Sequence, residues 1–505
     1  MQVGQSFFVG PWILYTFPLM RSLSRLDLAI VVVYNIAILG LGFVFVRRAR
    51  SSERFMTAGR SLPGWAVGLS IFGSYISSIS FLANPGKAFA DNWNPVVFAF
   101  SMPLAAWIAS RWFVPFYRNS GAVSAYEHLE QRFGPWARTY AVVCFLLMQI
   151  ARLGTILYLL ALALQPFTGW NVAWIIIVAG LLVTIYPFVG GTEGVIWLGV
   201  VQALVLIGGV AACLVAVLGG MPGGAGQIFR IAAEEHKFSL GSFGPGVSQS
   251  TFWVVLWYGL FTHLQNFGTD QSYVQRYITA RSDGGAKRSI WIGTWMYMPI
   301  SAAFFFIGTA LFAFYRVQPE RLPAGLDATK TPDAVFPHFI SAELVPGLAG
   351  LVIAAVCAAA MDSNLNCSAT LFLCDIYKRY WRPLAGERES RWVLRGSTIA
   401  FGVISTAAAL AMIKVRSALD VWWQLAGIFS GGVLGLFLLG AMNKRAGSLS
   451  GIIAIAAGVA VILWMTLSPM LHRLPRWAVS PFHNFLTLVI GTIVILVVGM
   501  LVRKK

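Results

Sequence analysis

Apolar residues along the chain gather into thirteen long runs separated by short polar connections. Each run is close to or longer than the 20 or so mostly apolar residues that a helix needs to cross a bilayer. No run has the alternating pattern of a transmembrane β-barrel strand. We therefore predict an all-α polytopic membrane protein with about 13 transmembrane spans. These lie near 27–46, 64–86, 93–117, 137–166, 171–190, 194–219, 251–275, 289–316, 345–376, 392–413, 418–440, 449–468 and 484–502.

The basic residues in the connections predict how the spans are oriented, because cytoplasmic loops are enriched in Lys and Arg. With the N-terminus outside, 24 of the 37 basic residues face the cytoplasm, 12 face the other side, and Arg152 lies within span 4. The C-terminus is then cytoplasmic, in a multi-pass protein of the cell (inner) membrane. Residues 1–26 form a peripheral segment, in which Met20 is an alternative start.

Composition supports the bilayer as the solvent of this chain. It is 58% hydrophobic and 11% charged, whereas a soluble domain is about 45–50% apolar and about 25% charged. The net charge of +18 does not indicate nucleic acid, since the basic residues form short clusters between apolar runs. The five cysteines lie in apolar runs without disulfide or metal-binding spacing. No motif of an enzyme is found, so we predict that the chain is not an enzyme.

Two spans carry polar residues at mid-depth. These are the stretches GSYISSIS at 73–80 in span 2 and HLQNFGTDQ at 263–271 in span 7. They lie five spans apart, and an odd repeat of five helices inverts its own topology. Broken helices at matching places in two inverted halves indicate a transporter site, because irregular backbone at this depth must line a cavity or be buried. The alternative for span 2 is a Ser/Gly-rich face for helix packing.

The chain resembles the sodium:solute symporter family, and within it most closely the bacterial sialic acid and sugar symporters. The motifs that carry this resemblance are RFMTAGRSLPGWA (54–66), SSISF (77–81), PGKAF (85–89), GGTEGVIW (190–197), VQRY (274–277) and DIY (375–377). The resemblance implies a LeuT-type inverted 5+5 helix repeat with flanking helices. The segments are then a peripheral 1–26, an accessory span and loop at 27–63, a first repeat at 64–219, an extracytoplasmic loop at 220–250, a second repeat at 251–440, and two accessory spans at 441–505.

The resemblance also implies a sodium ion bound by main-chain oxygens of Gly73, Ile76 and Ala359 and by hydroxyl groups that follow. The stretch 361–368 is about three residues shorter here, with Asp362 in place of one hydroxyl, while Ser363 can still coordinate. An ionised Asp362 would strengthen cation binding. Alternatively, Asp362 binds a proton and changes the coupling ion from sodium to protons, or it only hydrogen-bonds a neighbouring helix. A third alternative is that the shortened stretch disables the sodium site. Gly199 replaces an aspartate of a second sodium site, which predicts one coupling ion.

Arg152 is the principal candidate for binding the solute. An arginine deep in a span costs about 2.5–3.5 kcal/mol on insertion scales, and its guanidinium suits a carboxylate. The resemblance places Arg152, Ser77, Ser80 and an aromatic wall at Phe267 around the solute. Ala99 replaces a sugar-binding glutamine, which leaves room for carboxylates other than sialic acid. The alternative role of Arg152 is an ion pair, with Asp362 or Asp270 as the partner.

We therefore predict a sodium-coupled secondary active symporter that imports a small carboxylate-bearing solute, such as sialic acid or a sugar acid. Its partners are a small anion, the sodium ion and the lipid bilayer, without nucleic acid, and we expect a monomer. The alternatives are a proton-coupled transporter and a membrane protein that senses a solute without transporting it. A channel is disfavoured, because two offset helix breaks suit an occluded site better than a continuous pore.

Overall fold

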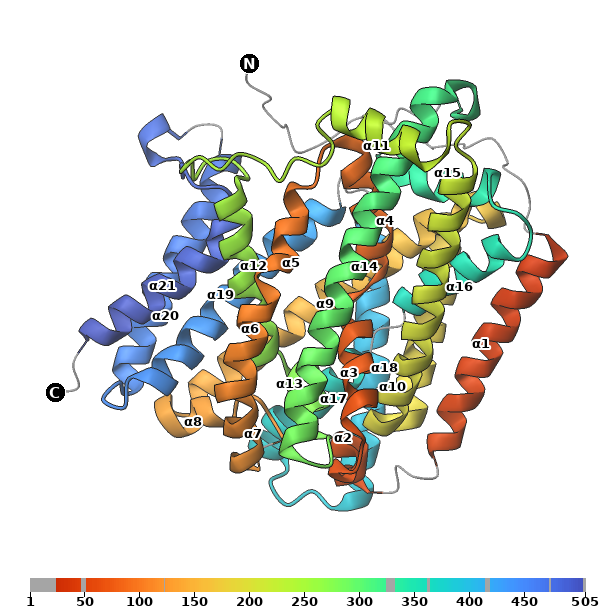
Figure 1. Ribbon diagram of the computed structural model, residues 1–505. Helices are drawn as coiled ribbons and strands as arrows, with labels where there is room; N and C mark the ends of the chain where they lie inside the picture. Colours follow the sequence, from red (N-terminus) through yellow and green to blue (C-terminus); the bar gives the residue numbers. More distant parts are fainter. Residues whose placement is uncertain are drawn as a thin grey trace.

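The computed structural model describes residues 24–46, 51–121, 123–323, 332–360, 364–413, 418–471 and 474–502. Within these ranges the chain is helical, and the β-structure amounts to one isolated parallel bridge between Leu62 and Ala280. The prediction of an all-α protein is confirmed. The helices cross the molecule side by side, with α14 (Asp283–Val317) near the centre of the view in Figure 1.

Each of the thirteen predicted spans overlaps at least one helix. The longer helices are α1 (Arg25–Val46), α3 (Gly64–Tyr75), α4 (Ser78–Ala90), α9 (Pro135–Thr168), α10 (Val172–Gly219), α12 (Phe252–Gly268), α14, α16 (Leu348–Ala360), α18 (Glu387–Met412), α19 (Ala418–Met442), α20 (Ser448–Leu467) and α21 (Leu486–Leu501). The shorter ones are α2 (Ser52–Thr57), α5 (Val97–Phe100), α6 (Met102–Ile108), α7 (Val114–Ser120), α8 (Glu127–Phe133), α11 (Gly224–Glu234), α13 (Gln271–Ile278), α15 (Val335–Ala342) and α17 (Asn364–Leu371).

The helices that meet a length and hydropathy criterion for crossing a membrane are fewer than the predicted spans. Seven helices in the described ranges are long and apolar enough to cross a membrane, and the bent pair of α3 and α4 makes an eighth. Three further apolar helices are shorter than this criterion, at Val172–Ile185, Leu348–Ala358 and Leu486–Leu501. The structure thus supports a multi-span protein, while the count of 13 spans is not confirmed.

The predicted spans 5 and 6 both lie within the assigned helix α10. The sequence predicts an interruption between residues 190 and 194. The helix assignment runs from Val172 to Gly219, while its apolar parts separate into Val172–Ile185 and Thr192–Gly219. Glycines inside a helix are unfavourable by only about 1 kcal/mol, so the Gly190–Gly191 pair does not end α10. The hydroxyl of Thr192 also ties this part of α10 to the main-chain oxygen of Met56, 3.0 Å away.

The centre of the molecule is held by close contacts between main chains. The helix α14 packs along α3 and α4. A side chain at Gly308 of α14 would bring its Cβ to 2.1 Å from the main-chain oxygen of Pro85 in α4. At this position only glycine fits, because real Cβ atoms do not come so close to a carbonyl oxygen. The bent pair α3–α4 is therefore braced along its length by α14.

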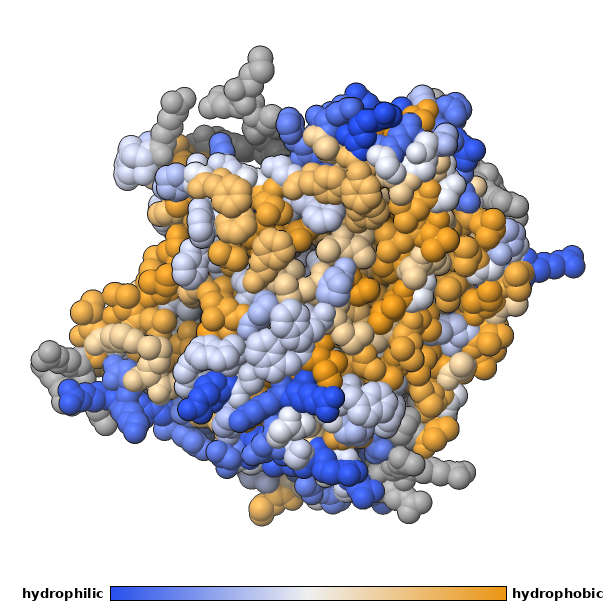
Figure 2. Space-filling model, in the orientation of Figure 1, coloured by the Kyte–Doolittle hydropathy of each residue, from blue (hydrophilic) through white to orange (hydrophobic). Residues whose placement is uncertain are grey.

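One side of this centre is covered by α1, and the opposite side by α19, α20 and α21 (Figure 1). Figure 2 shows an apolar band across the middle of the visible face, with hydrophilic surface gathered at its two ends. In the orientation of Figure 1 these ends carry α11 and α15 at the top and α2 and α7 at the bottom. A band of apolar surface between two polar ends is the pattern expected for a protein whose solvent is a bilayer.

Candidate functional site

The helix pair α3–α4 is interrupted at the predicted polar stretch 73–80. Helix α3 ends at Tyr75, and α4 starts at Ser78. Between them Ile76 (φ −99°, ψ 104°) and Ser77 (φ −109°, ψ 175°) are extended, and the axes of the two halves differ by 50°. The predicted break is confirmed, so the last carbonyl groups of α3 have no partner within the helix.

The second predicted break, at 263–271, is present but shorter than the polar stretch that indicated it. Helix α12 continues to Gly268, and only Thr269 (φ −136°) and Asp270 (φ −83°, ψ 115°) interrupt it before α13. The Asp270 carboxylate caps α13, since its Oδ1 accepts hydrogen bonds from the Ser272 main-chain N–H at 2.8 Å and from the Ser272 hydroxyl. The prediction was therefore right about the broken helix and wrong about where His263 lies, which is inside α12.

The two breaks meet at Ser74 and Tyr75. The main-chain oxygen of Ser74 accepts hydrogen bonds from Arg152 Nη2 at 3.0 Å and from the Tyr273 hydroxyl at 3.3 Å. The Tyr75 ring lies 4.8 Å from the Tyr273 ring and 5.9 Å from the Phe267 ring, measured between centroids. Side chains of α9, α12 and α13 thus converge on the end of α3.

The four residues predicted to bind the solute come together around this segment. Ser77 is buried, and the Ser80 hydroxyl lies 3.4 Å from the main-chain oxygen of Tyr75. Phe267 is fully buried and packs on Tyr75, while Arg152 reaches Ser74 as described. Their proximity agrees with a common site, and their role in binding a solute stays a prediction.

Two polar residues in this region lie beside the four predicted solute ligands. Gln149 is 3% exposed, and neither atom of its amide group has a hydrogen-bond partner among the described residues. The His263 Nε2 atom lies 3.1 Å from the main-chain oxygen of Phe98, so this nitrogen carries the proton. The other nitrogen, Nδ1, is then an acceptor, and it too has no partner in the described part of the chain.

Buried polar atoms without a partner are uncommon in native proteins and usually meet a water or a ligand. Gln149 precedes Arg152 by three residues, which puts both side chains on one face of α9. This spacing is the signal that could have identified Gln149 from the sequence.

The predicted sodium ligands are only partly described. Gly73 lies in the last turn of α3, Ile76 follows that helix, and Ala359 belongs to α16. Asp362 and Ser363 lie outside the described residues. Helix α16 packs on both α4 and α10. Main-chain carbonyl oxygens at the end of α3 are suitable ligands for a small hard cation, so the described residues Gly73 and Ile76 fit a sodium ion.

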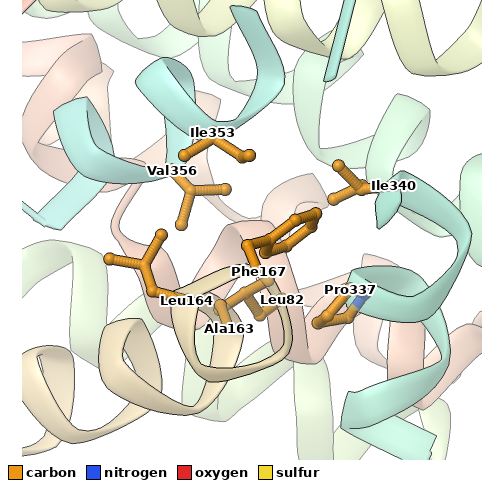
Figure 3. A pocket seen from close by; sticks show the side chains of 8 residues that line it. All are labelled: Leu82, Ala163, Leu164, Phe167, Pro337, Ile340, Ile353 and Val356. Carbon is orange, nitrogen blue, oxygen red and sulfur yellow. The ribbon is translucent and has the colours of Figure 1, made fainter. Parts of the chain in front are cut away.

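A cavity between α4, α9, α15 and α16 lies apart from these polar groups (Figure 3). Its lining consists of apolar side chains, namely Leu82, Ala163, Leu164, Phe167, Pro337, Ile340, Ile353 and Val356. An apolar lining offers nothing to an ion or a carboxylate. This cavity contains none of the predicted site residues and is not the candidate site.

A buried ion-pair network closes the end of the molecule at which α8 and α13 lie. Asp375 is fully buried, and its carboxylate accepts hydrogen bonds from Arg138 Nε at 2.8 Å, from Arg138 Nη2, and from the Ser124 hydroxyl at 2.6 Å. Arg138 Nη1 also donates to Glu130 at 3.0 Å. Pairing of this kind is needed to keep a carboxylate buried.

The amide of Gln271 joins the start of α13 to the loop that carries Ser124. Its Oε1 accepts from the Ala125 main-chain N–H and its Nε2 donates to the Val123 main-chain oxygen, both at 2.8 Å. The loop that carries Ser124 is therefore hydrogen-bonded both to the broken helix α12–α13, through Gln271, and to Asp375. We refer to Asp375, Arg138, Ser124 and Gln271 as the latch.

Comparison with known proteins agrees with this geometry. Residues 55–458 match the sodium:solute symporter family. The chain is 31% identical over 491 residues to the sodium/sialic acid symporter NanT of Aliivibrio fischeri, covering 95% of this chain and 93% of that protein. It is 33% identical over 450 residues to the sodium/sialic acid symporter SiaT of Proteus mirabilis, covering 88% and 90%. The human sodium-coupled monocarboxylate transporter 1 is 28% identical over 457 residues, covering 88% and 74%.

Two solved structures share the fold. A Na⁺-coupled sialic acid symporter in a substrate-bound outward-open state superimposes with a TM-score of 0.87, at 31% identity, covering 95% of this chain and 99% of that one. The transporter Mhp1 of the nucleobase-cation-symport-1 family superimposes with a TM-score of 0.52 at 17% identity, covering 88% and 92%, and shows the fold alone. These matches confirm the resemblance found in the sequence, and with it sodium symport across a membrane as the class of activity. The chain belongs to the sodium:solute symporter family.

Proposed function

We propose that this protein is a sodium-coupled secondary active symporter that imports a small carboxylate-bearing solute by alternating access. The observation that carries the proposal is the position of Arg152, whose guanidinium reaches the end of α3 at the helix break. A guanidinium deep in a bundle of apolar helices is unfavourable unless it serves a polar site. Its planar array of donors matches the two oxygens of a carboxylate.

The named substrates of the relatives support a carboxylate. Two relatives are sialic acid symporters and a third is a monocarboxylate transporter, and a carboxylate group is the feature that these solutes share. Ser77 and Ser80 supply hydroxyl groups and Phe267 an aromatic wall. Ala99 is buried and offers no hydrogen bond, which favours solutes with fewer hydroxyl groups than sialic acid.

Sodium is the proposed coupling ion, with the main-chain oxygens of Gly73, Ile76 and Ala359 and the side chains of Asp362 and Ser363 as ligands. We propose one ion per cycle. A Cβ at Gly199 would lie 2.7 Å from the Ser70 hydroxyl oxygen, so this position has no room for an acidic ligand. A sodium Hill coefficient clearly near two would contradict this stoichiometry.

We also propose the membrane arrangement predicted from the sequence. It has about 13 spans in an inner membrane, the N-terminus outside, the C-terminus in the cytoplasm, and two inverted repeats at 64–219 and 251–440. The α3–α4 and α12–α13 breaks occupy matching positions in these repeats, as expected for a transporter site. In this orientation the latch lies on the cytoplasmic side, and alternating access requires the latch to open.

The test is uptake into proteoliposomes that contain the purified full-length protein. Radiolabelled sialic acid, sugar acids and short monocarboxylates are offered with an inward sodium gradient, and again with potassium in its place. We expect uptake of at least one carboxylate that depends on sodium. Uptake that ignores sodium and stops when the proton gradient is removed would assign the coupling to protons. Binding of a carboxylate without uptake would identify a sensor instead.

A further inference from the structure

A buried lysine holds the end of α4 that lies opposite the helix break. Lys237 follows α11 and is 6% exposed. Its Nζ donates hydrogen bonds to the main-chain oxygens of Phe89 at 2.7 Å and Asp91 at 2.9 Å. A longer bond of 3.4 Å reaches the main-chain oxygen of Ala90, the last residue of α4. The last carbonyl groups of a helix have no partner within it, so Lys237 caps α4 with all three of its donors.

The charge of Lys237 also suits this position. The carbonyl end of a helix carries a partial negative charge, and a cation beside it is stabilising. The ammonium lies 3.9 Å from the centre of the Phe312 ring in α14, where the face of the ring attracts a cation. If the end of α4 moved away, the buried ammonium would lose its acceptors, which is unfavourable. Lys237 therefore favours the arrangement in which α4 ends at this place.

Further contacts join the connection after α11 to α14. The main-chain N–H of Trp93 donates to the main-chain oxygen of Lys237 at 3.1 Å, and the Trp93 indole donates to the Thr309 hydroxyl of α14 at 2.9 Å. Glu235 forms an ion pair with Arg316 of α14 at 2.7 Å. Figure 1 shows α11 at the end of the molecule to which α4 and α14 rise. These three helices are thus connected at this end.

The other end of α4 belongs to the candidate site. Helix α4 has 13 residues, which makes it about 20 Å long, and the predicted solute ligand Ser80 lies in its first turn. Pro85 weakens the middle of α4, because proline has no N–H to donate. Helix α14 spans this weak point. Its Gly308 leaves no room for a Cβ beside the main-chain oxygen of Pro85, and its Phe304 packs on Phe81 with ring centroids 5.0 Å apart. A shift at one end of α4 is therefore passed to the other.

We propose that Lys237 is a positioning residue for the solute site. It fixes the end of α4 at Ala90, and through α4 it sets the position of Ser77 and Ser80 at the helix break. It also attaches α11 and the connection after it to α4 and α14, so that these elements move together when the site opens and closes. This inference rests on the proposed function, because it takes the two serines as solute ligands.

A simple helix cap would have a more local effect than a positioning residue. Loss of a cap lets the last turn of a helix fray, and the missing hydrogen bond at Pro85 separates that turn from the rest of α4. The effect of a simple cap would then be confined to residues 86–90. A positioning role predicts a change on the far side of Pro85 as well, in residues 77–84 beside the helix break.

Hydrogen exchange of the purified full-length protein, followed by mass spectrometry, separates the two roles. Lys237→Met keeps an unbranched apolar stem over Phe312 and removes the charge and the donors. The matched control is Lys87→Met in the last turn of the same helix, because the Lys87 side chain is 46% exposed and its surface ion pair with Asp91 contributes little. We expect Lys237→Met to speed exchange about tenfold in residues 77–84 as well as in 86–90, and Lys87→Met to match the unaltered protein. Faster exchange in 86–90 alone, or in neither segment, overturns the positioning role.

Uptake kinetics in proteoliposomes provide a second measurement, with radiolabelled sialic acid or lactate, whichever the unaltered protein takes up. We expect Lys237→Met to raise the half-saturating concentration of this solute about tenfold, because misplaced ligands bind less well. The half-saturating sodium concentration should stay the same, since Gly73 and Ile76 precede α4. Lys237→Arg keeps the charge and donors and should restore most of the solute affinity. An unchanged solute affinity in Lys237→Met overturns the inference.

The two proposals fail in different ways. If the unaltered protein shows sodium-dependent uptake and Lys237→Met leaves residues 77–84 and the solute affinity unchanged, only the role of Lys237 is wrong. If the unaltered protein takes up no carboxylate with sodium, the proposed function fails. The exchange of residues 77–84 in Lys237→Met then still decides whether Lys237 positions α4.

Discussion

Arg152 of α9 donates a hydrogen bond from Nη2 to the main-chain oxygen of Ser74, 3.0 Å away, at the point where α3 ends. The same oxygen accepts from the hydroxyl of Tyr273 in α13. A single carbonyl group of one broken helix is thus bound by side chains of two other helices. Any movement of α3 relative to α9 or α13 must change these bonds, which couples the position of the guanidinium to the conformation of the breaks.

Replacement of Arg152 tests its role as the carboxylate ligand. We expect Arg152→Ala to reduce carboxylate uptake to background. Arg152→Lys keeps the charge but not the planar pair of donors, so we expect a reduction of about 10–100-fold. Uptake into proteoliposomes measures both, and sodium-dependent thermal stabilisation of each variant serves as the control for folding. Normal carboxylate uptake by Arg152→Ala would refute the assignment.

Gln149 is expected to contribute a hydrogen bond to the solute from the same face of α9. Loss of one such bond is worth about 1 kcal/mol or somewhat more, so Gln149→Leu should raise the half-saturating solute concentration about 5–10-fold and leave that of sodium unchanged. Gln202→Leu is the matched control, since Gln202 is buried in α10 and its amide nitrogen has no partner among the residues that the structure describes. Equal effects of the two substitutions would show that Gln149 meets only water.

The helix breaks could be predicted from the sequence because polar residues at mid-depth are rare enough to be informative. The residues at which each break begins and ends could not be predicted from the sequence. Polarity from His263 to Gln271 predicted a long interruption, yet His263 lies within α12 and hydrogen-bonds the main chain of α5. Only Thr269 and Asp270 leave the helical conformation. Polarity reports what a residue can bind, whereas the break is determined by which residue caps the next helix.

Contacts between distant parts of the chain could not be predicted from the sequence, for a different reason. The Gln275 amide meets Met56, and the Asn366 amide meets Thr192, across separations of 219 and 174 residues. A single sequence contains no information on which buried amide faces which helix. The family motifs indicated that Arg152 and Phe267 share a site, but the positions of Gln149, Gln275 and Asn366 emerged only from the packing.

Asp27 of α1 caps α16 across the helix interface. Its Oδ1 accepts hydrogen bonds from the main-chain N–H groups of Gly347 and Gly350, both at 2.7 Å. Removing a cap of this kind lowers stability by about 0.5–2 kcal/mol. We expect Asp27→Ala to lower the thermal unfolding midpoint clearly, and Asp27→Asn, which keeps an acceptor, to lower it less. Arg25→Ala, an exposed change in the same turn, is the control, and an equal midpoint for Asp27→Ala would show that the cap is not needed.

His338 of α15 gives the end of the molecule that carries α11 and α15 a predicted dependence on pH. Burial holds the pKa of His338 below its usual 6.5, although the Arg321 main-chain oxygen, 3.0 Å from Nε2, and the carboxylate of Glu343 oppose this effect. The unfolded chain therefore binds a proton at His338 more readily than the folded protein does. Stability is not affected by His338 above pH 6.5 and falls as the pH decreases below that value, by at most about 1.4 kcal/mol per pH unit.

Thermal unfolding at pH 7.5 and pH 5.5 measures this contribution. We expect the midpoint to fall more between the two pH values for the unaltered protein than for His338→Gln, whose side chain does not titrate. The difference between the two proteins isolates His338 from the other groups that titrate in the same range. A group affects the pH dependence of stability only if the folded and unfolded states bind its proton differently. An identical decrease of the midpoint for the unaltered protein and for His338→Gln would therefore mean that protonation of His338 is not linked to unfolding.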